Sequence, residues 1–108
     1  MTETKFTPGP WIAGHLGSDS TCQCSSILAE GYMGCIATVE VDNGRAVSDG
    51  GNDAPPLEEA VANMHLIAAA PDMYEALEAA ANSAGFQYMW PNTRSKIEAA
   101  LAKARGET

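Results

Sequence analysis

Residues 35–41, which read Cys35-Ile-Ala-Thr-Val-Glu-Val41, decide the first half of the fold. Small apolar side chains recur there at every second position, which is the period of a half-buried β-strand. We therefore predict a strand over residues 34–41 and two shorter strands at about 11–15 and 25–30. Glu30-Gly31 predicts a tight turn between the second and third strands. Three short strands joined by turns predict an antiparallel meander.

The period of the apolar residues changes to that of a helix after residue 56. The apolar stripe consists of Leu57, Val61, Met64 and Ala68. Their i, i+4, i+7 and i+11 spacing predicts an amphipathic helix that starts next to Pro56. Pro71 is expected to end or kink this helix, because proline removes a backbone donor and clashes with the preceding turn.

Two further alanine-rich helices are predicted after that proline. We expect the first to be closed by Gly85 in a left-handed conformation. The second is expected at about 93–104, capped by Asn92 or Thr93 and stopped by Gly106. The chain therefore has an α+β pattern: a small N-terminal antiparallel β-meander followed by two to three C-terminal helices.

Length and charge limit the possible functions. A length of 108 residues predicts a single domain, 1–108. The net charge of the chain is −8. Its acidity disfavours binding to DNA, RNA or anionic membranes. No apolar run approaches the roughly 20 residues that span a bilayer, and the first residues lack a secretion signal. We expect a cytoplasmic protein whose thin, alanine-rich core favours oligomerisation.

The cysteines and histidines do not form a familiar catalytic or metal-binding pattern. Cys22, Cys24, Cys35 and His15 could in principle hold a metal, but their spacing is not that of the usual zinc sites. A cysteine nucleophile would need His15 or His65 as its base, and no cysteine lies in a context that would activate a thiol. We favour structural roles for these side chains. No cofactor, metal or enzymatic activity is predicted.

Binding candidates come from three other parts of the chain. Phe86, Tyr88 and Trp90 precede Arg94, a combination that suits a nucleobase and a phosphate, although aromatic residues in such a connector more often cover the edge of the core. Arg45 lies in the long irregular stretch 42–56, a length at which loops are often functional. Asn63 interrupts an apolar helical stretch, either as a bland exposed residue or as a hydrogen-bonding anchor.

Three blocks of the sequence resemble a family of small phage and prophage proteins. They are Thr7-Pro-Gly-Pro-Trp11, Cys35-Ile-Ala-Thr-Val39 and Ala62-Asn-Met-His-Leu-Ile-Ala-Ala-Ala-Pro-Asp-Met-Tyr-Glu-Ala-Leu77. The last block is the most specific. Residues 42–61 and 82–92 contribute little to the resemblance.

The layout of a small sheet followed by alanine-rich helices also resembles the Thoeris anti-defence sponge proteins of phages. That resemblance implies a dimer or hexamer in the bacterial cytoplasm that sequesters a cyclic nucleotide immune signal without cleaving it. The signal would be a cyclic ADP-ribose isomer or a cyclic oligonucleotide, and the ligand-binding residues that the resemblance implies are Arg45, Asn63, Phe86, Trp90 and Arg94. The net acidity is a departure, since an anionic ligand needs a local positive pocket, which subunits could build together. The alternative is an acidic phage protein that inhibits a host or immune protein by direct binding.

Overall fold

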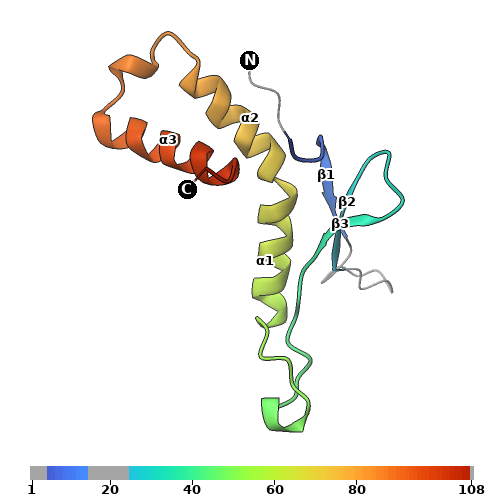
Figure 1. Ribbon diagram of the computed structural model, residues 1–108. Coiled ribbons are helices and arrows are strands. Elements are labelled where there is room, and N and C mark those ends of the chain that lie inside the picture. Colours follow the sequence, from blue (N-terminus) through green and yellow to red (C-terminus); the bar gives the residue numbers. More distant parts are fainter. Residues whose placement is uncertain (1–4, 15–24, 108) are drawn as a thin grey trace. The chain divides into compact units, whose positions relative to one another are not determined.

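The computed structural model describes residues 5–14 and 25–107, and the chain divides into two compact units. We call Thr7–Ala70 the sheet unit, and Met1–Phe6 together with Pro71–Thr108 the helical unit. The strands precede the helices along the chain (Figure 1), which confirms the predicted α+β class. The prediction of a single domain stays a prediction.

The sheet is an antiparallel meander, as predicted. Its strands, in spatial order, are β1 (Trp11–Ala13), β2 (Ser26–Ala29) and β3 (Cys35–Thr38). The expected turn after β2 is present: the Tyr32 amide donates to the Ala29 carbonyl at 3.3 Å, and Gly31 has a φ of 90°. Each strand is shorter than its predicted range, and His15, at the predicted end of the first strand, lies outside the described residues.

The core of the sheet unit forms between the sheet and α1 (Leu57–Ala68). Its buried side chains are Ile27, Val39, Ala60 and Met64. Ile27 and Met64 are the largest fully buried side chains among the described residues. Trp11 packs against the same cluster, and its indole N–H donates to the Thr7 carbonyl at 3.0 Å. This bond closes the Thr7–Trp11 turn and fixes the start of β1.

Proline separates the first two helices, as predicted. The last helical residue of α1 is Ala68, and the amide of its C-cap, Ala69, donates to the His65 carbonyl. The next helix, α2 (Ala70–Ala81), has Pro71 in its first turn, where no backbone donor is needed.

The other boundaries in the helical unit differ in part from the prediction. A 3₁₀ turn, η2 (Phe86–Tyr88), follows α2 and leads into α3 (Pro91–Ala104). Gly85 has a φ of −83° and precedes η2, so the prediction that it closes the second helix was wrong. The predicted Asn92 or Thr93 cap was also wrong, because Pro91 takes the first helical position and Trp90 is the N-cap.

The C-terminal end of α3 follows the predicted glycine stop. Gly106 has a φ of 77°. Its amide donates to the Lys103 carbonyl at 3.1 Å, and the Glu107 amide donates to the Ala102 carbonyl at 2.9 Å. These two bonds are the Schellman pattern, which satisfies carbonyls that the helix end would otherwise leave unpaired.

Candidate functional site

Phe86, Trp90 and Arg94 lie along the segment that leads from η2 into the first turn of α3. Trp90 is 81% exposed, and Phe86 in η2 is half-buried. The Arg94 amide donates to the Trp90 carbonyl at 3.0 Å, so the two residues lie one helical turn apart. The structure therefore places three of the five predicted ligand-binding residues on one short segment.

Arg94 is half-buried, and its charge is not neutralised locally. Its Nε atom is buried without a hydrogen-bond partner, and it forms no ion pair with the described residues. A buried guanidinium N–H without an acceptor is unusual and costly. Among the described residues, the chain therefore supplies no acceptor for this N–H.

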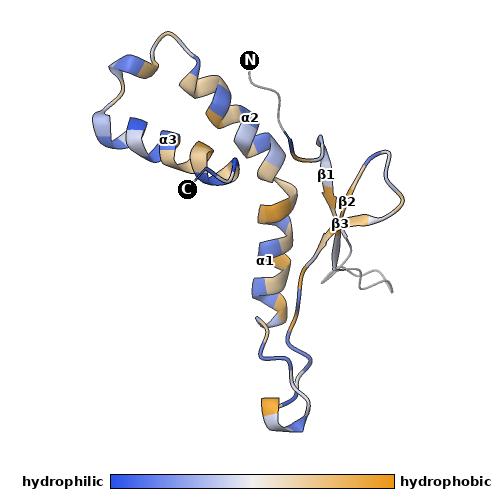
Figure 2. Ribbon diagram, in the orientation of Figure 1, coloured by the Kyte–Doolittle hydropathy of each residue, from blue (hydrophilic) through white to orange (hydrophobic). Residues whose placement is uncertain are grey.

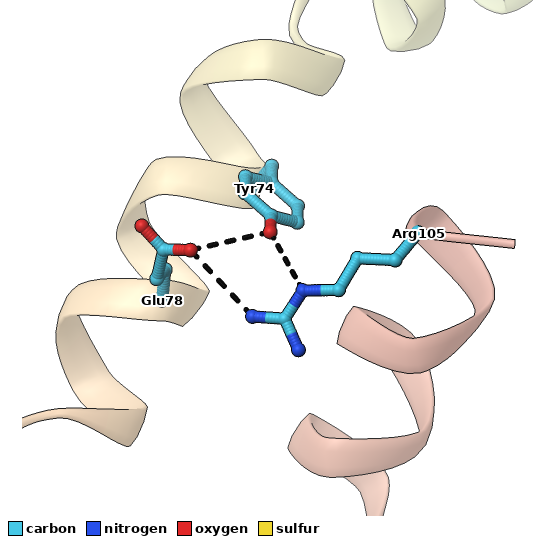
Figure 3. A network of polar contacts seen from close by, with 3 residues as sticks. All are labelled: Tyr74, Glu78 and Arg105. Carbon is cyan, nitrogen blue, oxygen red and sulfur yellow. Dashed lines mark hydrogen bonds and ion pairs between the residues drawn. The ribbon is translucent and has the colours of Figure 1, made fainter. Parts of the chain in front are cut away.

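A second cationic group of the helical unit is already paired. The Arg105 Nε donates to the Tyr74 hydroxyl at 2.9 Å, and that hydroxyl donates to Glu78 Oε2 at 3.2 Å (Figure 3). An ion pair of 3.5 Å between Arg105 and Glu78 closes the triangle and joins α2 to α3. The hydrogen bond with Tyr74 raises the pKa of Arg105 above its ordinary value. This network holds the helical unit together and leaves Arg94 as the unpaired arginine beside the aromatic segment.

The sheet unit has a shallow pocket of about 290 Å³. Its lining residues, from the end of β3, the following loop and α1, are Thr38, Val39, Glu40, Pro55, Asn63, Leu66 and Ile67. We call it the Glu40 pocket, after its only acidic lining residue. Asn63 is exposed at its surface, which places this predicted ligand-binding residue beside a cavity and not in the core.

Arg45 lies elsewhere in the sheet unit, on a loop that we call the tip loop (residues 42–55). It does not line the Glu40 pocket, so the structure does not bring Arg45 and Asn63 together in one cavity. Neither belongs to the unit that holds Phe86, Trp90 and Arg94. The five predicted residues are therefore divided between two units, and their joint role in one site stays a prediction.

Among the described residues, the only cysteine is Cys35. Cys35 is exposed, and hydrogen bonds with the Thr38 and Ser26 hydroxyls lower its pKa. The part of the chain that the structure describes has no cluster of three or more His, Cys, Asp or Glu side chains that could hold a metal. Cys22, Cys24 and His15, which the sequence suggested as possible ligands, lie outside that part.

Some features of these surfaces could not be found from the sequence pattern. Glu40 is simply the polar position in an alternating strand, and Leu66 reads as part of an apolar helix. Only the packing of α1 beside the end of β3 turns them into the walls of one pocket.

Among the described residues, no helix is long and apolar enough to cross a membrane.

Comparison with known proteins identifies the origin of the chain. The family model described as Salmonella phage P22 protein Y8K6 matches residues 1–108, and the chain belongs to this family. The prediction of a small phage protein is thereby confirmed. No curated protein and no solved structure matches the chain.

Proposed function

Starting from its membership of a phage protein family, we propose that this protein binds and sequesters a cyclic nucleotide immune signal without cleaving it. The ligand would be a cyclic ADP-ribose isomer or a cyclic oligonucleotide. The observation that supports this most is the pairing of an exposed indole, Trp90, with the unneutralised guanidinium of Arg94 one helical turn later.

The chemistry of that pair matches the two parts of such a ligand. An exposed indole offers a flat face on which a base can stack, worth about 1–3 kcal/mol per base. An arginine binds phosphate oxygens through two parallel hydrogen bonds, which a lysine cannot reproduce. Because the Arg94 guanidinium has no carboxylate partner among the described residues, binding a phosphate breaks no existing ion pair.

The proposal is tested by calorimetry and native mass spectrometry with cyclic di- and trinucleotides and cyclic ADP-ribose isomers. We expect a stoichiometric complex from which heat releases the ligand intact. Arg94→Ala should weaken binding about tenfold to a hundredfold, since a hydrogen bond to a charged group contributes roughly 1.5–3 kcal/mol. Lys96→Ala, which removes an exposed cation from the same helix, is the matched control and should bind as the parent does.

A cleaved ligand would refute sequestration, and equal losses from both variants would remove Arg94 from the site. If no member of the panel binds, the second candidate becomes the leading one: inhibition of a host or immune protein by direct contact. Exposed apolar side chains at the turn after β2 support that candidate, because Tyr32 and Met33 stand in solvent on a strongly acidic chain. Capture of one host protein that is lost at high salt, with no small ligand bound, would favour it.

A further inference from the structure

The tip loop is held in shape by its own hydrogen bonds. The Asp42 amide donates to the Pro55 carbonyl at 2.7 Å, which joins the two ends of the loop. Asn52 donates from its side-chain amide to the Val41 carbonyl at 2.8 Å and accepts from the Asn43 amide at 3.2 Å. Loops with joined ends and internal packing are frequently functional.

A close backbone approach further restricts the loop. At Gly51, a Cβ atom would collide with the Arg45 carbonyl oxygen and would lie 2.6 Å from the carbonyl group of Ala46. Any residue with a side chain would therefore force the backbone of the tip apart. The Gly51 amide uses this closeness to donate to the Ala46 carbonyl at 2.7 Å. The tip has one backbone path, which limits the entropy lost when it binds.

The tip displays one apolar and one cationic side chain that it does not use internally, beside the exposed carboxylate of Asp49. Val47 is 65% exposed, at the start of the 3₁₀ turn η1 (Val47–Asp49). Figure 2 shows a hydrophobic colour at one end of this turn and a hydrophilic colour at the other. Arg45 is the only Lys or Arg between residues 7 and 70, and its guanidinium makes no hydrogen bond or ion pair with the described residues.

The Glu40 pocket has the complementary chemistry. Its walls are mainly apolar, with Leu66 left 60% exposed beside them. Glu40 supplies a carboxylate, and Asn63 an amide. The volume, about 290 Å³, is at the lower end of the roughly 300–1,000 Å³ of small-molecule sites. It suits one or two protein side chains better than a cyclic dinucleotide, whose negative charge Glu40 would also repel.

The tip loop does not fill the pocket of its own chain. The pocket is lined from the middle and later turns of α1, whereas η1 lies beyond the N-terminal end of that helix (Figure 1). The short hydrogen-bonded base of the loop keeps the tip pointing away. The tip of the same chain therefore does not occupy this pocket.

We propose that the tip loop of one copy of this chain docks into the Glu40 pocket of a second copy. Val47 enters between the apolar walls, and Arg45 pairs with Glu40 at the rim. The contact joins two different surfaces, so it produces a reciprocal two-fold dimer, a closed ring or an open head-to-tail filament. This inference does not depend on the nucleotide ligand, and it gives Arg45 a role different from the ligand-binding role predicted from the sequence.

The test is charge reversal followed by mixing. The mass of the full-length protein is measured by light scattering after size exclusion over a range of concentrations. We expect Arg45→Glu and Glu40→Arg each to weaken self-association about a hundredfold, since like charges facing each other cost several kcal/mol. An equimolar mixture of the two variants should associate again, because each loop then meets a pocket of opposite charge. Glu30→Arg, an equal charge change at the exposed turn after β2, should associate as the parent does.

Far-UV circular dichroism shows whether a variant that no longer associates is still folded. The mixing experiment is a second control, because only folded variants can associate again when they are mixed. The proposal is overturned if the parent protein is monomeric at every concentration. It is equally overturned if the single variants associate normally, if their mixture stays monomeric, or if Glu30→Arg dissociates as Glu40→Arg does.

Discussion

The stability of the sheet unit should depend measurably on the buried side chain of Met64. Met64 is 1% exposed and lies at the centre of the small cluster between α1 and the sheet. Replacing a buried methionine by alanine costs about 2–5 kcal/mol, through lost transfer free energy and the cavity that remains. Domains of this size are stable by only about 5–15 kcal/mol. Met64→Ala should therefore remove a large part of the stability of the sheet unit.

The two tryptophans allow this loss to be assigned to one unit. Trp11 packs against the core of the sheet unit, whereas Trp90 belongs to the helical unit. In a Trp90→Phe background, tryptophan fluorescence during urea unfolding reports only on the sheet unit. With a denaturant slope of about 1–3 kcal/mol per molar urea, the midpoint should fall by roughly 1–3 M.

Met33→Ala is the matched control, because Met33 is fully exposed in the same unit and loses the same atoms. It should shift the free energy of unfolding by less than about 0.5 kcal/mol. Met64→Leu, which nearly conserves volume, should cost less than about 1.5 kcal/mol. Equal midpoints for the two alanine variants would refute the assignment of the core to the contact between α1 and the sheet.

Three further predictions concern other parts of the chain. Leu77→Asp places a charge at a half-buried position of α2 and should destabilise the helical unit by about 1–3 kcal/mol; an unchanged melting temperature and unchanged size would contradict this. Tyr74→Phe deletes the hydroxyl that joins α2 to α3 and should lower the melting temperature by a few degrees, seen by circular dichroism. Iodoacetamide should alkylate Cys35 with a pH midpoint below the ordinary value for a thiol. Thr38→Val should raise that midpoint, as read from the modified peptide by mass spectrometry, because the Thr38 hydroxyl stabilises the thiolate.

The elements themselves could be predicted because their signals are local. The alternation in residues 35–41 and the helical spacing from Leu57 to Ala68 can each be found from the order of neighbouring residues, although Cys35 and Leu57 are exposed in the structure. Pro71 and Gly106 are local signals of the same kind. Pro71 lacks a backbone donor, and Gly106 tolerates a positive φ.

The errors at helix ends arose where two local signals competed. Asn92 is a good N-cap in isolation, but Pro91 is better suited to the first helical position, and this moves the cap to Trp90. Gly85 was read as a helix stop, whereas the chain leaves α2 at Ala81 and passes through a turn first. The Ser83 amide and hydroxyl both bond to the Ala80 carbonyl, which explains how the helix can end early without a glycine.

The candidate sites were less predictable because they depend on contacts between distant residues. The aromatic segment with Arg94 is contiguous in sequence, so composition alone could point to it. The Glu40 pocket requires β3, the tip loop and α1 to meet, and no periodicity encodes that meeting. For the same reason, the sequence does not show whether Arg45 binds a phosphate or takes part in self-association through the tip loop.

The division of the chain into two units makes those two roles of Arg45 separable by experiment. If Arg45 acts only in self-association, Arg45→Glu should dissociate the protein and leave nucleotide affinity per chain unchanged, because Trp90 and Arg94 belong to the other unit. If the ligand pocket is built across subunits, the same variant should lose both properties. Mixing it with Glu40→Arg should then restore both together, because the mixture re-forms the contact. Restored association with ligand binding at only about half of the sites would instead show that Arg45 contacts the ligand itself, because half of the chains in the mixture lack Arg45.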